Sequence, residues 1–219
     1  MYDDKQPWYF NFVRRDIAAL LPSRAERVLE VGCGAGATLQ WLRSTGQAGH
    51  TTGIELAADA AAVARTRVDR LLEGPLDQHL HSLPKAGYDL VLCLDVLEHL
   101  VDPWQATRDL RDLLQPGGTL IVSLPNVRNH RVVLPLLLNG RWQYRDAGIM
   151  DRTHLRFFSR HGARELLEQA GLDITAEAST GKRRGDRDFW KDKLTLGLMS
   201  PLFVVQYLLR GTRPVGTLS

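Results

Sequence analysis

The sequence predicts an α/β fold built around a mostly parallel β-sheet. Short β-branched or leucine-rich runs alternate with longer helical patterns through the first half of the chain, and this alternation is typical of βαβ units. The run at 88–94 is apolar at both odd and even positions, as expected of a strand that helices cover on both faces. The 219 residues are enough for one well-filled core, so we expect a single domain over 1–219.

The individual elements follow from these patterns in chain order. We expect strands at 27–33, 50–56, 88–94, 119–125, 172–179 and 203–210. Helices are expected at 37–45, 57–72, 104–114 and 160–171, and the last residues of 57–72 also fit a third strand. Asp102 before Pro103 predicts a capped helix start, Gly171 predicts a helix end, and the glycines in 115–118 predict a turn. Residues 126–160 are expected to form a long insertion, and 180–193 a loop.

The charge and the cysteine content narrow the class of protein. The chain has 28 Lys and Arg against 25 Asp and Glu, and seven arginines between 127 and 161 stand against two acids. Such a segment attracts anions or is simply a solvated basic face. The two cysteines form no CxxC pair, which argues against a disulfide scaffold or a cysteine-rich metal site.

The sequence also bears on membrane contact and location. The first ten residues carry acids and no apolar core of a signal peptide, so we expect a cytoplasmic protein. Gly197 and Pro201 interrupt the apolar run at 194–209, which is shorter than the roughly 20 residues of a spanning helix. Peripheral contact with a membrane surface stays open.

A glycine-rich loop follows the first predicted strand. Gly32, Gly34 and Gly36 would let the backbone approach a nucleotide-like cofactor at the carboxyl ends of the strands. Glu55 ends the second strand about 20 residues later, where a carboxylate can bind both hydroxyls of a ribose. With Ala37 the same residues also fit the dinucleotide fingerprint, so the loop alone does not identify the cofactor.

Five stretches together carry a resemblance to a known family. They are VLEVGCGAGATLQWL, GIEL, YDLVLCLDVLEHLVDPW, LQPGGTLIVSLPN and DRTHLRFFSRHGARELLEQAGLDI. In this order they resemble the class I S-adenosylmethionine-dependent methyltransferases, most of all the small-molecule O-methyltransferases of the ubiquinone and polysaccharide-associated types. The resemblance implies a Rossmann-like, mostly parallel sheet of seven strands with helices on both faces and the last strand antiparallel. It implies S-adenosylmethionine as cofactor and an acceptor such as a sugar, a uronic acid or a quinol.

The resemblance also implies roles for single residues. Glu30 would approach the methionine ammonium, Glu55 would hold the ribose hydroxyls and Leu56 would contact the adenine. The acidic residue usual after the third strand is displaced by a proline in EGPLDQ, and Asp77 is taken as its substitute. The remaining cofactor contacts would come from Gly32, Gly34, Gly36, the carbonyl of Leu94 and Asp95.

Two histidines are the candidate catalytic bases. Methyl transfer requires alignment of donor and acceptor and removal of a proton from the acceptor. His99 lies just after the strand at 88–94, and His154 lies in the insertion expected to cover that strand end. Imidazole titrates near neutral pH, so either side chain could accept the proton.

The insertion supplies candidate contacts to the acceptor. If 152–156 is extended, Arg152, His154 and Arg156 project from one face, where two arginines would suit an anionic acceptor. Asn126, at the start of the insertion, is a further candidate contact. In the structural alternative the arginines pair with acids such as Asp146 or Asp151, and His154 bonds to the backbone.

The stretch DVLEH at 95–99 supports two interpretations. As a helix start, Asp95 would be the N-cap and Glu98 the third residue of a capping box. The stretch is also similar to one in plant small-RNA 2′-O-methyltransferases, and that similarity would make Asp95, Glu98, His99 and His154 ligands of Mg²⁺ or Mn²⁺. A divalent metal is thus possible but not expected.

Three other functions compete with small-molecule methylation. Methylation of an RNA ribose is compatible with the basic insertion, although a nucleic-acid partner is not expected. An NAD(P)-dependent oxidoreductase could use the same glycine loop, but the sequence offers no separate substrate domain and no Tyr-x-x-x-Lys pair after the nucleotide-binding half. A non-catalytic binding module is the third alternative: Glu30, the glycines and Glu55 argue against loss of the cofactor, but cofactor binding alone does not prove turnover.

Overall fold

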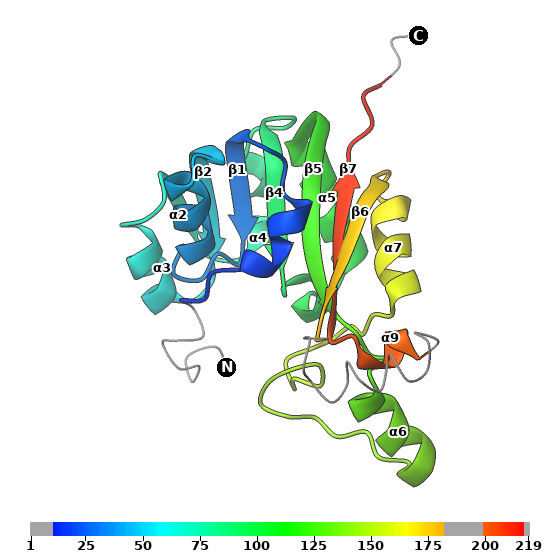
Figure 1. Ribbon diagram of the computed structural model, residues 1–219. Helices are drawn as coiled ribbons and strands as arrows, with labels where there is room; N and C mark the ends of the chain where they lie inside the picture. The colour runs from blue at the N-terminus through cyan, green and yellow to red at the C-terminus, as the bar shows by residue number, and fades with distance from the viewer. Residues whose placement is uncertain (1–10, 182–198, 217–219) are drawn as a thin grey trace.

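A computed structural model describes residues 11–181 and 199–216, and its seven strands form one mixed sheet (Figure 1). The strands lie in the order β3-β2-β1-β4-β5-β7-β6. Their bounds are β1 (Ala25–Val31), β2 (Ala48–Glu55), β3 (Arg70–Glu73), β4 (Tyr88–Leu94), β5 (Leu114–Pro125), β6 (Asp173–Thr180) and β7 (Gln206–Thr212). The helices and 3₁₀ turns are η1 (Arg15–Leu20), α2 (Ala37–Ser44), α3 (Ala58–Ala64), α4 (Leu76–His79), η2 (Leu80–Ser82), η3 (Leu97–His99), α5 (Pro103–Leu113), α6 (His130–Asn139), α7 (Arg160–Gln169) and α9 (Ser200–Phe203).

The sheet is parallel except around its last strand. β1 runs parallel to β2 and β4, β2 to β3, and β4 to β5. β7 inserts between β5 and β6 and runs antiparallel to both. The predicted seven-stranded sheet with an antiparallel last strand is therefore confirmed.

Two apolar layers cover the faces of the sheet, as predicted. One layer joins the sheet to η1, α2 and α3 through side chains such as Ile17, Leu39 and Leu42. The other joins it to η3, α5 and α7 through side chains such as Leu97, Leu110 and Leu166. β1, β4 and β5 contribute to both layers, which explains why the run at 88–94 is apolar on both faces.

Several local predictions are confirmed and others need correction. Pro103 opens α5, and the Asp102 carboxylate accepts a hydrogen bond from the Gln105 amide, as a capped start requires. Gly171 adopts a φ of 79° just after α7. The helix expected over 57–72 is shorter than predicted, because α3 ends at Ala64. The last residues of the expected range belong to β3, as the alternative interpretation predicts. The predicted turn at 115–118 lies inside β5, where the pairing with β4 shifts register.

The carboxyl ends of the parallel strands share one end of the molecule with the insertion. There β5 leads into α6 and the segment 140–159, whereas the chain leaves β7 at the opposite end (Figure 1). The last predicted strand begins at Gln206, because α9 precedes it. The loop expected at 180–193 and the start of the apolar run at 194–209 lie outside the described residues. No helix in the described ranges is long and apolar enough to cross a membrane.

Candidate active site

The glycine loop turns sharply at the end of β1. Gly32, Gly34 and Gly36 all have positive φ, between 54° and 75°, a region in which L-residues with a Cβ are strained. A Cβ on Gly32 would also lie 2.6 Å from the Val96 side chain, which follows β4. The loop therefore requires glycine both for its conformation and for its close contact with the neighbouring strand end.

Glu55 closes this loop from β2. Its buried carboxylate accepts hydrogen bonds from the Gly34 amide at 2.7 Å and from the Ala57 amide at 2.8 Å. Each carboxylate oxygen retains further acceptor capacity. Glu55 thus shapes the loop directly, and its predicted contact with a ribose stays a prediction.

Glu30 is a buried carboxylate at the end of β1. Its side chain is 3% exposed, and its Oε2 atom accepts no hydrogen bond. Burial raises the pKa of Glu30 to about 8, Arg14 pulls that pKa down, and Glu55 pushes it up. An uncompensated carboxylate of this kind suits a cationic ligand group, which fits the predicted contact with a methionine ammonium.

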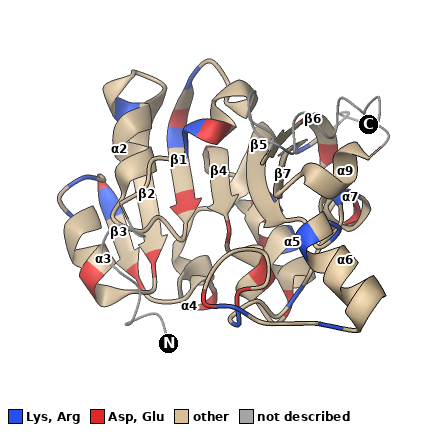
Figure 2. Ribbon diagram, turned by 60° about the horizontal axis from the view of Figure 1, so that its bottom comes forward, with Lys and Arg blue, Asp and Glu red and all other residues tan. Residues whose placement is uncertain are grey.

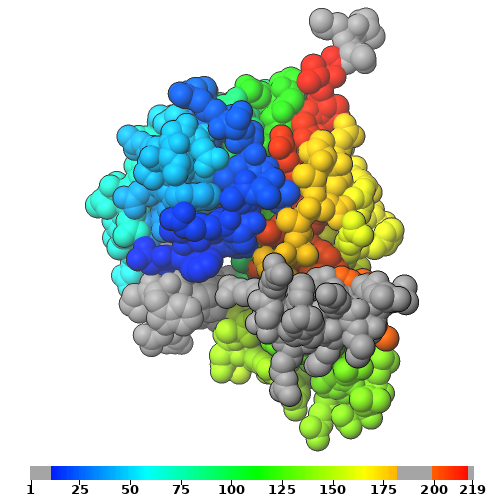
Figure 3. All heavy atoms as spheres, viewed as in Figure 1, coloured from blue at the N-terminus to red at the C-terminus, as the bar shows by residue number. Residues whose placement is uncertain are grey.

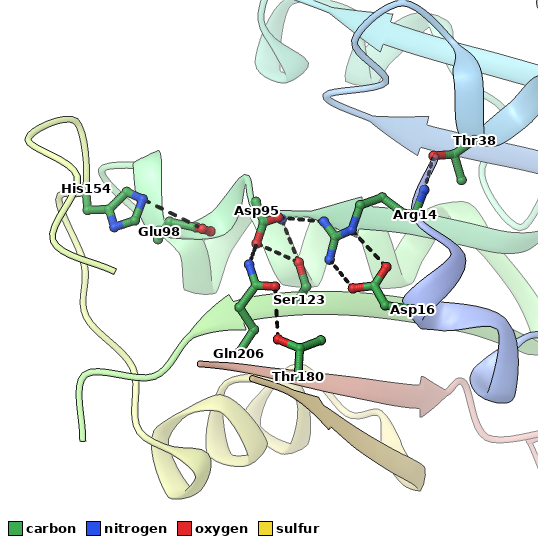
Figure 4. Close-up of polar contacts among 9 residues, drawn as sticks. All are labelled: Arg14, Asp16, Thr38, Asp95, Glu98, Ser123, His154, Thr180 and Gln206. Atoms are coloured by element: carbon green, nitrogen blue, oxygen red, sulfur yellow. Dashed lines mark hydrogen bonds and ion pairs between the residues drawn. The ribbon is translucent and has the colours of Figure 1, made fainter. Parts of the chain in front are cut away.

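Arg14, from the segment before η1, reaches across this end of the sheet (Figure 4). Its guanidinium donates to Asp95 Oδ2 at 2.5 Å and to the two oxygens of Asp16 at 3.0 and 2.9 Å. Burial by itself would lower the pKa of Arg14, but Asp95 and Asp16 outweigh it and the pKa is raised. The guanidinium therefore stays charged and joins the N-terminal segment to the end of β4.

Asp95 is the centre of this network. Its Oδ1 atom accepts from the Ser123 hydroxyl at 2.8 Å and from the Gln206 amide at 2.6 Å, so β5 and β7 also hold it. Its φ of 57° is in the left-handed region, which Asp tolerates better than most residues. The sequence does not predict the contacts of Arg14, Ser123 and Gln206 with Asp95, because no spacing pattern connects segments so far apart.

The capping-box interpretation of DVLEH is wrong. The turn that follows is the single 3₁₀ turn η3, its N-cap is Val96, and no side chain caps it. Asp95 bonds to Arg14, Ser123 and Gln206 instead. Glu98 turns inward, is 1% exposed, and has no hydrogen-bond donor at either carboxylate oxygen.

The insertion folds onto η3 and brings His154 to Glu98. The Leu155 and Arg156 amides both donate to the Glu98 backbone carbonyl, at 2.8 and 3.0 Å. His154 Nε2 then lies 4.0 Å from Glu98 Oε1 (Figure 4), and the rings of His99 and His154 meet edge to face with centroids 4.7 Å apart. Two segments more than 50 residues apart therefore build one polar cluster.

Backbone carbonyls determine which tautomer each neutral imidazole ring adopts. His99 Nδ1 lies 3.2 Å from the Thr153 carbonyl oxygen, and His154 Nδ1 lies 3.0 Å from that of Ile149. A carbonyl only accepts hydrogen bonds, so each Nδ1 carries the proton and each Nε2 is the acceptor nitrogen in the neutral ring. A general base that acts through Nε2 requires this tautomer, and so does a histidine that binds a metal through Nε2.

The cluster fits a divalent metal with three of the four predicted ligands. Glu98, His99 and His154 offer ligand atoms within 4.8 Å of one another. Burial, followed by repulsion from Asp95, raises the pKa of Glu98 well above its ordinary value, and a cation would relieve that cost. Asp95 does not join this cluster, because its carboxylate faces Arg14, Ser123 and Gln206.

The predicted common face of Arg152, His154 and Arg156 is wrong. The backbone turns at 151–154, where the Asp151 carboxylate accepts from the Thr153 amide and hydroxyl. His154 is therefore buried while both arginines point to solvent. Arg152 pairs with Asp146 at 2.8 Å, as the structural alternative predicts, and Arg156 donates to the Val101 carbonyl.

The other predicted contacts have varied surroundings. Asn126 is fully buried, and its amide donates to the Pro201 and Val204 carbonyls, so it ties β5 to the segment before β7. Leu56 is half exposed after β2, and Asp77 is exposed on α4. The structure places Leu94 at the buried end of β4. The cofactor and substrate roles of all four stay predictions.

The chain is similar to known methyltransferases in both structure and sequence. A crystal structure of an S-adenosylmethionine-dependent methyltransferase from Archaeoglobus fulgidus superposes with a TM-score of 0.70 at 16% identity, covering 91% of each chain. At that identity the likeness establishes the fold, which is that of the class I methyltransferases. Residues 6–177 also match the family model described as a methyltransferase domain.

Curated relatives agree with that assignment. The ubiquinone biosynthesis O-methyltransferase of Xylella fastidiosa is 32% identical over 74% of this chain and 70% of its own length. The Aeromonas salmonicida protein of the same name is 28% identical over 67% of this chain and 63% of its own length. The chain belongs to the class I S-adenosylmethionine-dependent methyltransferases, which decides against the NAD(P)-dependent oxidoreductase that the glycine loop left open.

Proposed function

We propose that this methyltransferase methylates a hydroxyl oxygen of a small acceptor of the quinol type. The observation that carries the proposal is the cluster of Glu98, His99 and His154, in which His99 is only half-buried, beside the carboxyl end of β4; such a cluster can deprotonate a hydroxyl. The names of the curated relatives support a quinol-type acceptor. Sugars and uronic acids are the next candidates, since they also present hydroxyls.

The cofactor half would hold the donor through the residues at the ends of β1 and β2. S-adenosylmethionine supplies an electrophilic methyl group on a positively charged sulfur. Glu30 would ionise and bind the methionine ammonium, while Glu55 would hold the ribose hydroxyls without releasing the Gly34 amide. Arg14 and Asp95 would keep the wall of this pocket in place.

In the acceptor half, His99 would act as the base. It is less buried than His154, and the Thr153 carbonyl keeps its Nε2 in the acceptor state. The acceptor oxygen would form a bond to the methyl carbon as the carbon–sulfur bond breaks, and the hydroxyl proton would pass to His99 Nε2. His154 and Glu98 would hold the positive charge that develops on this ring.

As an alternative to a free His99 base, the same three side chains would hold a divalent metal, and His99 Nε2 would then be a ligand and could not accept the proton. The ion would supply a Lewis acid that favours the deprotonated acceptor oxygen. Mg²⁺ or Mn²⁺ accepts this mixture of carboxylate and imidazole ligands. Glu98, without a hydrogen-bond donor of its own, is the strongest indication for such an ion.

Transfer of a labelled methyl group tests the function directly. Purified enzyme and labelled S-adenosylmethionine are offered a short-chain quinol, a sugar nucleotide, a uronic acid and an RNA, each with EDTA, Mg²⁺ or Mn²⁺. We expect label on the quinol and little on RNA. Loss of label in EDTA, restored by Mg²⁺ or Mn²⁺, would assign Glu98, His99 and His154 to metal binding in place of His99 as the free base. Exclusive labelling of RNA would replace the proposal with ribose 2′-O-methylation, and full activity in EDTA would remove the metal from it.

Substitutions separate the two histidine roles. His99→Ala should lower kcat by about a hundredfold or more with cofactor affinity unchanged. His154→Ala should lower both kcat and Mn²⁺ affinity, measured by calorimetry on the protein alone. Glu26→Gln, an exposed side chain near the start of β1, is the control and should change neither. Equal losses of turnover and cofactor affinity in both histidine variants would indicate a purely structural role.

A further inference from the structure

Asp95 adopts a backbone conformation that few side chains tolerate. Among the residues that the structure describes, Ala86 and Asp95 are the only ones other than glycine with a positive φ. Ala86 lies in the turn before β4, whereas Asp95, with a φ of 57°, lies between the end of β4 and the turn η3. The left-handed region costs free energy for a residue with a Cβ, so the surrounding contacts must hold Asp95 there.

The conformation of Asp95 determines how the chain leaves β4. The turn η3 carries Glu98 and His99, and no side chain caps its start. Its far end is fixed, because the Glu98 carbonyl accepts hydrogen bonds from two amides of the insertion. The near end depends on the backbone of Asp95, one residue before the N-cap Val96. A rotation at Asp95 would therefore move Glu98 and His99 relative to His154.

Three side chains donate to the carboxylate of Asp95 (Figure 4). The Ser123 hydroxyl donates to Oδ1 at 2.8 Å, and the same hydroxyl oxygen accepts from the Asp95 amide at 3.0 Å. Gln206 Nε2 donates to Oδ1 at 2.6 Å, and Arg14 donates to Oδ2. Of these three donors only Arg14 is charged. Gln206 therefore holds the carboxylate without neutralising it.

Gln206 is a well-fixed donor. It is the first residue of β7 and pairs with Pro125 of β5 and Thr180 of β6. Its Oε1 atom accepts from the Thr180 hydroxyl at 3.5 Å, and its Nε2 atom points to Asp95. The segment before β7 is tied down as well, because the Asn126 amide donates to two of its carbonyls. The donor thus comes from a rigid part of the sheet.

Acidic residues gather at this end of the sheet. Figure 2 shows them, in red, at the carboxyl ends of the parallel strands. The buried members are Glu30, Glu55 and Glu98. Because like charges repel, the carboxylate of Asp95 needs donors to stay beside them. In Figure 3 the N-terminal residues, in blue, lie against β6 and β7, so Arg14 and Gln206 reach Asp95 from elements that pack together.

We propose that Gln206 is a positioning residue for the acceptor half. By holding Asp95 in the left-handed conformation, Gln206 fixes the direction of the chain after β4 and, with it, the place of η3. The proposal rests on the proposed function, in which η3 supplies Glu98 and His99 to the acceptor half. Gln206 acts through Asp95 and needs no contact with the acceptor.

Hydrogen exchange tests the positioning without any methyl donor or acceptor. Gln206→Met keeps the length of the side chain and removes the donor. We expect the amides of His99 and Leu100, which donate within η3, to exchange about tenfold faster. The matched control is Gln115→Met, because Gln115 donates to Asp89 at the opposite end of β4. The control should leave the η3 amides unchanged, and an unchanged exchange rate in Gln206→Met overturns the proposal.

A double-mutant cycle tests whether Gln206 acts through Asp95. Gln206→Met should lower kcat about tenfold and change the cofactor dissociation constant less than about threefold, because Arg14 still holds Asp95. Asp95→Gly adopts the left-handed conformation without a donor, so adding Gln206→Met to it should change kcat less than about twofold. An equal fall of kcat in both backgrounds, or a loss of cofactor affinity in place of kcat, overturns the proposal. If no acceptor is methylated, the proposed function fails, whereas hydrogen exchange still decides the positioning.

Discussion

Glu30 and Glu98 are both buried carboxylates at the carboxyl end of the sheet, yet their electrostatic surroundings differ. After burial, the strongest influence on the pKa of Glu30 is Arg14, which stabilises the charged form. The strongest influence on Glu98 after burial is Asp95, which destabilises the charged form. Burial disfavours the charged form of both carboxylates, but Arg14 partly offsets this for Glu30, whereas Asp95 adds to it for Glu98.

This difference matches the ligands that each half would receive. A cofactor with a fixed positive charge can ionise Glu30 at modest cost, because Arg14 already stabilises its carboxylate. The buried side chain of Glu98 is stable only if it is protonated or if a cation, either a metal ion or a protonated His154, lies beside it. The carboxylate of the acceptor half therefore depends more strongly on a proton or a nearby cation than that of the cofactor half.

Replacing Glu98 is the strongest test of that comparison. Glu98→Gln keeps the size of the side chain and removes its charge, so we expect kcat to fall by about a hundredfold or more. The thermal midpoint should stay the same or rise, because a buried carboxylate without a donor destabilises the fold. Turnover and thermal melting of the same preparation provide both measurements.

The matched variant in the cofactor half is Glu55→Gln. Glu55 accepts two backbone amides, so its replacement should weaken S-adenosylmethionine binding with a smaller effect on kcat. If Glu98→Gln also raised the dissociation constant of the cofactor and left kcat unchanged, the division of the site into two halves would be wrong.

The cofactor half could be predicted from the sequence in most of its parts. The glycine loop follows β1, and Glu55 is the last residue of the adjacent parallel strand β2. Chain order and strand topology together therefore place both at one edge of the sheet. Arg14 could not be predicted, because its contact with Asp95 depends on how the N-terminal segment crosses the sheet. No periodicity or spacing records such a crossing.

In the acceptor half, three of the predicted residues lie close together, the predicted geometry is wrong, and the roles of the residues stay predictions. The sequence predicts a common site for Glu98, His99 and His154, and the structure brings their side chains together. The same prediction includes Asp95, because sequence spacing does not show that a left-handed φ turns this carboxylate toward Arg14. The prediction of an extended segment at 152–156 is wrong for a similar reason. Sequence spacing does not show that the Asp151 side chain stabilises a turn there.

A smaller effect is expected from the pH dependence of cofactor binding. Burial raises the pKa of Glu30 from 4.5 to about 8 in the free protein, so below pH 8 the carboxyl is largely protonated. The methionine ammonium favours the ionised form, so binding releases a proton and affinity rises by up to about tenfold per pH unit until pH 8. Calorimetry in two buffers of different ionisation enthalpy measures this proton release.

The folding stability of the free protein should fall as pH rises, whereas the affinity for the cofactor should rise. The unfolded chain loses the Glu30 proton near 4.5 and the folded chain near 8, so this group makes the protein less stable as pH rises through that window. Glu30→Gln should abolish both slopes, with Arg14 and Glu55 still in place as the charged neighbours. Proton release that persists in Glu30→Gln would assign it to another group.

The smallest effect is expected from Arg152→Ala in the insertion. Its ion pair with Asp146 joins side chains that are 62% and 89% exposed, so its loss should change the free energy of unfolding by less than about 0.5 kcal/mol. If the arginine attracts an anionic acceptor, the KM for that acceptor rises a few-fold while kcat and the cofactor dissociation constant stay constant. Arg24→Ala is the matched control, since Arg24 is equally exposed, pairs with Glu26 and lies far from the insertion. An equal change of KM in both variants would show that the overall charge, rather than the insertion, attracts the acceptor, and it would leave recognition to the buried cluster alone.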